Sequence, residues 1–183
     1  ESVTEELEDY SSQLIGRVNQ ELRLKPEVTG KIIKEISAFL TTYHLTAVPS
    51  DNNFEKLDIK VHAAWFVRQF KHEFNPLHLH TNCELSCVGY LKLPQGLRKE
   101  WDEDKKNSSA HGTLEFAYGT SGLGKYSKGS VKIEPEIGDF YVFPSSLWHV
   151  VYPFMSMGER RSFSMNLTIK TNKTDLVNAI NFT

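Results

Sequence analysis

Two histidines in the stretch "NPLHLH", His78 and His80, are the first residues whose types and spacing could do chemistry. Residues two apart in a β-strand project from the same face, so both imidazoles can reach one point. Neutral imidazole is a common ligand of divalent transition metals. The pair therefore suggests a metal site, although His-x-His alone also fits two ordinary polar residues on a strand.

A metal ion at a working site needs a third protein ligand, which must come from elsewhere in the chain. The stretch "EIGDFYVFPSSLWHVVYPF" offers His149. A strand led by Gly138 ends at Pro144, and a short turn then delivers His149 at the start of the next strand. This position makes His149 the candidate third ligand.

A row of polar side chains follows in "GERRSFSMNLTIK", where Arg160, Ser162, Ser164 and Asn166 alternate with Arg161 and apolar residues. On a strand these four residues face the same way. A buried row of this kind needs an anionic partner, and arginine pairs with a carboxylate through two parallel hydrogen bonds. The row predicts an anion site, with a solvated strand face as the alternative.

The elements that must position these residues change along the chain. Apolar residues at three- and four-residue steps predict helices over Val3–Leu22 and Pro26–Leu40. A loop is expected from 46 to 57, and the most polar loop from 99 to 112. The remainder predicts short strands: "KVHAAWFVRQF", "LSCVGYLKLP", "GTLEFAYG", "GSVKIEP", "GDFYVFP", "HVVYPF" and "RRSFSMNLTIK". The fold class is therefore mainly β with N-terminal helices, a sandwich or barrel braced by two helices.

Length and charge narrow the classes of protein. A chain of 183 residues without internal repeats predicts one domain, with helical support over 1–45 and a strand core over 58–170. A net charge of −2 with scattered lysines and arginines indicates no nucleic-acid partner. No apolar run approaches the roughly 20 residues that span a bilayer, and the first residues, "ESVTEELEDY", are acidic. A soluble, cytoplasmic protein without membrane contact is expected.

Taken in order, four motifs resemble those of iron(II)/2-oxoglutarate-dependent oxygenases, in particular a phage and bacterial group with a His-x-His motif. They are His-x-His-x-Asn from His78, Ser-x-x-x-Tyr-Leu from Ser86, Phe-Pro-Ser-x-x-x-His ending at His149, and Arg-x-Ser-x-x-x-Asn from Arg160. The match covers roughly residues 58 to 168. It implies a double-stranded β-helix, a jelly-roll or cupin-like barrel that holds a metal at its open mouth.

The resemblance also implies roles for single residues. His78, His80 and His149 would bind Fe(II), and Arg160 with Ser162 would hold the distal carboxylate of the cosubstrate 2-oxoglutarate. Tyr90 and Asn82 would be further cosubstrate-binding candidates, and Ser86 and Asn166 would line the pocket. The implied activity is a dioxygenase that oxidises, by hydroxylation, an unidentified small molecule or protein side chain with release of succinate and CO₂. Helices packed on one side of such a barrel are compatible with a homodimer.

Two alternatives remain at this point. A cupin would use His78, His80, Glu84 and His149 as metal ligands, in an isomerase, a cosubstrate-independent oxygenase or a sugar-binding module. A domain on the same barrel without a metal is the other. The wider oxygenase superfamily more often has His-x-Asp, so histidine at position 80 leaves open whether His80 or a carboxylate such as Glu84 is the third ligand.

Overall fold

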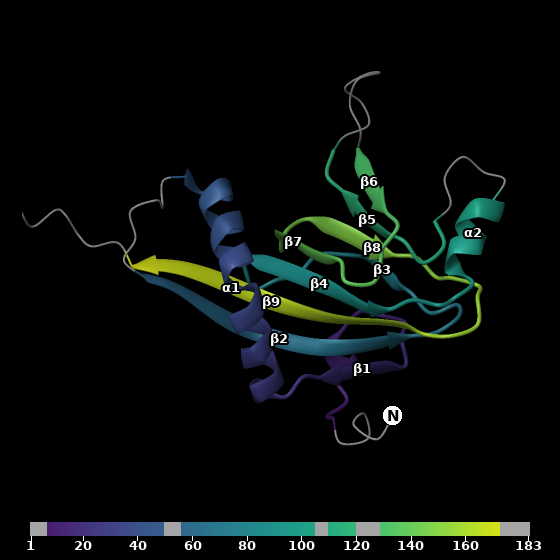
Figure 1. Ribbon diagram of the computed structural model, residues 1–183, viewed down its shortest axis with the longest axis horizontal. Helices are drawn as coiled ribbons and strands as arrows, with labels where there is room; N and C mark the ends of the chain where they lie inside the picture. Colours follow the sequence, from purple (N-terminus) through teal and green to yellow (C-terminus); the bar gives the residue numbers. More distant parts are fainter. Residues whose placement is uncertain (1–6, 50–55, 105–109, 120–128, 173–183) are drawn as a thin grey trace, which may run out of the picture.

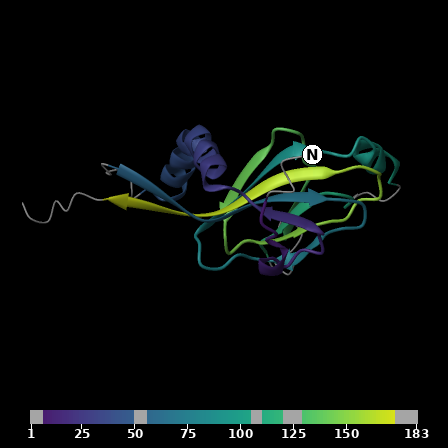
Figure 2. The same cartoon turned by 90° about the horizontal axis from the view of Figure 1, so that it is seen from below.

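The structure is a computed structural model, and it describes residues 7–49, 56–104, 110–119 and 129–172. Two antiparallel sheets face each other (Figures 1 and 2). The larger sheet has the strand order β1 (Gln20–Arg23), β2 (Lys56–Gln69), β9 (Arg160–Asn172), β4 (Leu85–Lys92) and β7 (Phe140–Pro144). The smaller has the order β3 (Asn75–His78), β8 (Trp148–Val151), β5 (Leu114–Ala117) and β6 (Ser130–Ile133).

The chain passes back and forth between the sheets. From β3 onward it alternates smaller, larger, smaller, larger, smaller and larger sheet, with β5 and β6 forming a hairpin within the smaller one. This winding, together with β2 as a first long strand, is that of a jelly roll. The mainly β, jelly-roll prediction is therefore confirmed.

Helix α1 (Pro26–Ala47) braces the outer face of the larger sheet, where β2 and β9 run on beyond the barrel (Figures 1 and 2). Pro26 occupies the first helical turn, where its missing N–H costs nothing. Leu40 is fully buried, and it packs with the outward-facing side chains Met165, Leu167 and Ile169 of β9. The apolar half of the β9 alternation thus holds the helix, which leaves the polar half for the barrel interior.

A second apolar cluster lies between the two sheets. Its buried members are Val88, Tyr90, Leu114, Phe116, Phe143 and Val151. The Phe116 and Phe143 rings lie edge to face at 4.8 Å, and Phe143 meets the His149 ring at 4.9 Å. This packing fixes the strand that carries His149.

The helix predicted over Val3–Leu22 is wrong for the described part of that segment. Residues 7–22 contain one turn of 3₁₀ helix (Ser11–Gln13) and end in strand β1. Backbone bridges from Asp9 to Leu22 and from Arg17 to Phe74 tie the segment to β1 and to the residue before β3. The apolar residues at helical spacing, among them Tyr10, instead pack against Trp65 (ring centroids 6.1 Å apart). Sheet-edge pairing overrides the local periodicity here.

The second predicted helix is confirmed and is longer than expected, reaching Ala47.

The polar loop predicted over 99–112 begins inside another helix, α2 (Leu97–Glu103), and residues 105–109 lie outside the described residues. Leu97 anchors α2 in the core, and Trp101 Nε1 donates to the His111 carbonyl at 2.7 Å. No helix in the described ranges has the length and apolar character needed to cross a membrane.

Candidate metal centre

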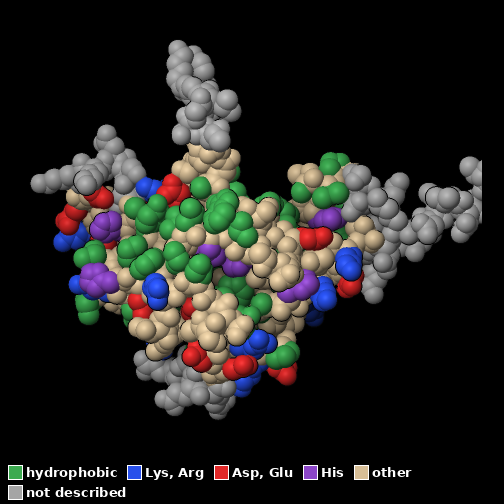
Figure 3. Space-filling model, turned by 180° about the vertical axis from the view of Figure 1, so that it is seen from behind, with side chains coloured by type: hydrophobic (Ala, Val, Ile, Leu, Met, Phe, Trp, Pro, Cys, Tyr) green, Lys and Arg blue, Asp and Glu red, His purple; other side chains and the backbone are tan. Residues whose placement is uncertain are grey.

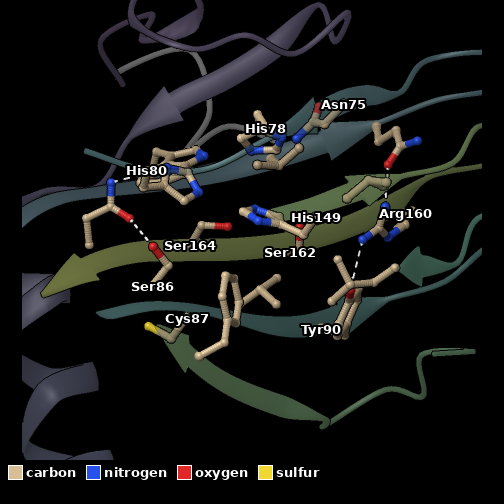
Figure 4. Close-up of a pocket in the computed structure, with 18 residues that line it drawn as sticks. Asn75, His78, His80, Ser86, Cys87, Tyr90, His149, Arg160, Ser162 and Ser164 are labelled. Atoms are coloured by element: carbon tan, nitrogen blue, oxygen red, sulfur yellow. Dashed lines mark hydrogen bonds between the residues drawn. The ribbon is translucent and has the colours of Figure 1, made fainter. Parts of the chain in front are cut away.

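Three imidazoles converge in a pocket lined by both sheets (Figure 4). One ring nitrogen from each of His78, His80 and His149 lies within 4.8 Å of the other two. His78 and His149 are directly opposite each other on the neighbouring strands β3 and β8, with ring centroids 4.2 Å apart. No carboxylate of the described residues belongs to this cluster. The arrangement can offer three neutral nitrogen ligands to one ion.

Backbone carbonyls fix the orientation of two of these rings. The Nδ1 of His78 lies 2.6 Å from the Pro76 carbonyl, and the Nδ1 of His149 lies 2.9 Å from the Leu147 carbonyl. A carbonyl only accepts, so each Nδ1 must carry the proton. The lone pair of each ring then lies on Nε2, the nitrogen that a histidine of this tautomer offers to a metal.

His80 is positioned by a loop and not, as predicted, by the strand that carries His78. Strand β3 ends at His78, and the His80 amide donates to the Ser145 carbonyl at 2.9 Å. Ser145 in turn donates through its hydroxyl to the Cys83 carbonyl at 2.6 Å. The serine of the "FPSS" turn, itself buried, thereby holds the loop that carries His80.

A pair of polar side chains, the Asn166 amide and the Ser86 hydroxyl, supports His80 from the larger sheet. Asn166 Nδ2 lies 3.5 Å from His80 Nδ1, and the Ser86 hydroxyl donates to Asn166 Oδ1 at 2.9 Å. Ser86 and Asn166 are direct partners on β4 and β9. Both residues, expected to line the pocket, do so.

The three imidazoles are held in the neutral form. Burial, and then the neighbouring His78, lowers the pKa of His149 to about 3 and that of His80 to about 4, and burial also lowers the pKa of His78. Near pH 7 all three therefore keep a lone pair for a metal.

These lowered pKa values predict how the stability of the metal-free protein depends on pH. The unfolded chain takes up protons at the ordinary histidine pKa of about 6.5, whereas the folded chain does not until much lower pH, so stability is retained above about 6.5 and falls as the pH drops below it. Each such group contributes up to about 1.4 kcal/mol per pH unit. Melting temperatures at pH 7.5 and 5.5 test this, and a His149→Gln variant should show a weaker dependence. Equal melting temperatures of the native chain at both values would contradict the neutral cluster.

A buried cation lies in the same pocket as the histidines. Arg160, only 3% exposed, donates from Nη1 to Gln69 Oε1 at 2.6 Å and from Nη2 to the Tyr90 hydroxyl at 3.0 Å (Figure 4). Its guanidinium also lies over the Tyr90 ring, 4.9 Å from the centroid. Its Nε is buried without a hydrogen-bond partner. Among the described residues, Arg160 has no carboxylate partner.

The nearest acid in the sequence does not balance this charge. Glu159 is bound by Arg68 at 2.6 Å and by Arg161 at 2.8 Å, with Lys92 at 3.4 Å. Burial alone would raise its pKa, but the hydrogen bonds from Arg161 and Arg68 lower that pKa to about 2. Glu159 therefore pairs with these three cations and not with Arg160. The charge of Arg160 inside the barrel has no anionic partner among the described residues.

Most of the predicted site residues meet in this pocket. The polar row of β9 (Arg160, Ser162, Ser164, Asn166) lines it together with Tyr90 and the three histidines. Asn82 does not: its φ of 61° interrupts the regular strand that the prediction assumed, and it lies at an outer cavity beside His80. Glu84, the fourth ligand of the cupin alternative, is exposed and outside the histidine cluster.

Sequence reasoning missed Gln69, which is 2% exposed. Its Nε2 donates to the Glu73 carbonyl at 2.5 Å, so its Oε1 is left facing Arg160. A neutral amide at this point orients the guanidinium without neutralising it. The only sequence signal is the alternation of Trp65, Val67 and Gln69, which places an amide on an apolar inward face.

Comparison with known proteins completes the description of the site. A family model described as "Putative 2OG-Fe(II) oxygenase" matches residues 63–166, more than half of the chain. No curated protein matches the sequence. A Pseudomonas putida prolyl-4-hydroxylase structure is similar, with 17% identity, 91% of this chain and 78% of that chain covered, and a TM-score of 0.54. A viral collagen prolyl hydroxylase from Paramecium Bursaria Chlorella virus-1 is also similar, with 16% identity, 87% of this chain and 84% of that chain covered, and a TM-score of 0.51. At these identities the two structures bear on the fold alone.

Proposed function

Because the chain belongs to this family of 2OG-Fe(II) oxygenases, we propose that it is an iron(II)- and 2-oxoglutarate-dependent dioxygenase. His78, His80 and His149 would bind Fe(II), and Arg160 would bind the distal carboxylate of 2-oxoglutarate. The substrate would be hydroxylated: one C–H, O₂ and 2-oxoglutarate give one C–OH, succinate and CO₂.

The observation that carries the proposal is the uncompensated charge of Arg160 in the pocket of the three histidines. A buried guanidinium without a carboxylate is costly unless an anion completes it. 2-Oxoglutarate brings one carboxylate for the arginine and, at its other end, an oxo acid that chelates a metal. Three protein ligands leave coordination positions open for such a chelate. The residues present therefore fit both groups.

Each residue of the pocket has a positioning task in this proposal. Tyr90 lies under the guanidinium, and Ser162, two residues along β9 and 5% exposed, offers a hydroxyl on the same face. Gln69 holds the guanidinium from the other side. Iron with 2-oxoglutarate supplies the oxidative chemistry, so the chain itself needs to bind, orient and shield rather than transfer protons.

A thermal-shift experiment under anaerobic conditions tests the proposal. Fe(II) and 2-oxoglutarate together should raise the melting temperature more than the sum of their separate shifts, because the cosubstrate binds both the metal and Arg160. Succinate, which lacks the oxo group, is the matched control and should give a smaller shift. If the metal stabilises the protein and 2-oxoglutarate adds nothing at any concentration, the cosubstrate assignment is wrong.

A further inference from the structure

A second cavity adjoins the histidines and shares Trp65, Asn75, His78, His80 and Asn166 with the inner pocket. Its volume is about 380 Å³, and it does not include Arg160, Ser162 or Tyr90. Its outer wall is the segment Tyr10–Gly16, which spans the edges of the two sheets. In Figure 3 histidine side chains lie in a hollow among hydrophobic side chains on the face shown. We call this space the outer cavity.

The outer cavity holds a carboxyl group, whereas the inner pocket holds the guanidinium of Arg160. Its described lining contains no lysine or arginine, and its only carboxylate is Glu21. Glu21 lies on β1 and is 1% exposed, and neither of its carboxylate oxygens has a hydrogen-bond partner. Asn75 Oδ1 is also buried without a partner. Three buried acceptors of the wall, the two Glu21 oxygens and Asn75 Oδ1, therefore have no hydrogen-bond partner among the described residues.

These three acceptors converge beside Gly16, which also lines the outer cavity. A Cβ on Gly16 would lie 2.6 Å from Asn75 Oδ1 and 2.9 and 3.0 Å from the two Glu21 oxygens. Because Gly16 has no side chain, its backbone can approach these oxygens closely. A side chain at this position would collide with them and displace Glu21 or Asn75.

The neighbouring side chains do not relieve the buried carboxylate. Burial, and then the charges of Glu73 and Asp9, raises the pKa of Glu21 to about 7. Glu73 accepts hydrogen bonds from Asn19 and from the Phe70 amide. Because a carboxylate only accepts, Glu73 offers no hydrogen bond to the Glu21 oxygens. Burying an acceptor without a donor is unfavourable, and a charged donor compensates best. A cation that brings N–H groups would satisfy these acceptors and keep Glu21 ionised.

Resting on the proposed function, we propose that the outer cavity binds the substrate through a protonated amine or guanidinium group that donates to Glu21 and Asn75. Asn75 lines both cavities, so a group bound there lies next to the histidine cluster. Tyr10, Leu14 and Trp65 supply an apolar wall for the methylene groups that precede such a head group. The oxidised C–H would belong to this aliphatic stem.

The test uses the full chain with Fe(II) and 2-oxoglutarate, and four matched probes: L-lysine, L-arginine, L-norleucine and L-glutamate. Each is measured free and as the N-acetylated, C-amidated residue, which distinguishes a free amino acid from a protein side chain as the source. Lysine or arginine, in one form or both, should raise the melting temperature anaerobically and stimulate succinate release in air. In the N-acetylated, C-amidated form, norleucine has the same stem without a charge, and it should do neither at equal concentration.

Glu21→Gln should weaken binding of the effective probe at least about tenfold, since a charge-assisted hydrogen bond is lost. The shift given by Fe(II) with 2-oxoglutarate should stay unchanged, and Glu134→Gln, at an exposed carboxylate away from the cavity, should change neither. Capped norleucine as effective as capped lysine, no response to either cation, or unchanged probe affinity in Glu21→Gln would overturn the inference. If 2-oxoglutarate with Fe(II) gives no added melting-temperature shift in the native chain, the proposed function itself is wrong.

Discussion

Replacing His149 by alanine is expected to lower the affinity for Fe(II) by more than about 100-fold. The reason is that it removes one of three ligands from a cluster without a carboxylate, and even the loss of a residue that only supports a ligand costs about 10- to 100-fold. Metal titration of the purified variant, followed by calorimetry, measures this. His149 is 5% exposed and packs on Phe143, so the melting temperature of the metal-free variant must be recorded beside it.

The matched control for that substitution is Glu84→Gln. Glu84 is exposed and outside the cluster, so its neutralisation should leave Fe(II) affinity within a factor of about two. Loss of metal binding in Glu84→Gln with retention in His80→Ala would show that the carboxylate replaces His80 as the third ligand, whereas loss in both variants would favour the cupin alternative, which uses both residues. The same pair of variants therefore distinguishes the two sets of ligands.

Replacing Arg160 by methionine is expected to weaken 2-oxoglutarate binding by about 100-fold or more and to leave Fe(II) affinity nearly unchanged. Methionine keeps much of the length of arginine and removes the charge that would pair with the carboxylate. Because the cation is uncompensated in the metal-free protein, its removal also relieves a buried charge, which offsets the lost bonds to Gln69 and Tyr90. The melting temperature of the metal-free variant should therefore stay close to that of the native chain.

Arg160→Lys is the matched control, since it keeps the charge and loses the planar fork. Its affinity for 2-oxoglutarate should fall between those of the native chain and the methionine variant. A purely structural role for Arg160 predicts a different result, namely a large fall in stability with equal losses of metal and 2-oxoglutarate binding. Titrations of both ligands with all three proteins separate these outcomes.

The local sequence pattern was sufficient to predict the pocket-lining residues where polar and apolar side chains alternate regularly. On β9 every second residue from Arg160 to Asn166 lines the pocket, and the residues between them pack outward, as alternation predicts. His149 was found from a strand, a proline and a turn, which are also local signals. The resemblance in motif order then predicted which of these residues would meet.

Local pattern failed where distant pairing decides the conformation. Residues 7–22 carry a helical period, yet their backbone pairs with β1 and with Phe74, a partner far along the sequence. His80 reaches the cluster because the Ser145 carbonyl and hydroxyl hold its loop. Gln69 and Glu21 acquire their significance only from the partners that they meet or lack in three dimensions. No spacing in the sequence encodes these relations.

The most direct test of the central claim is an anaerobic optical titration of the Fe(II)-loaded protein with 2-oxoglutarate. Chelation of Fe(II) by a 2-oxo acid gives a visible charge-transfer absorption that neither component shows alone. The proposed site predicts that this absorption appears, saturates at one equivalent in the native chain, is absent with succinate, and requires far more 2-oxoglutarate in Arg160→Met. Bound Fe(II) with no such absorption at any 2-oxoglutarate concentration would contradict the account.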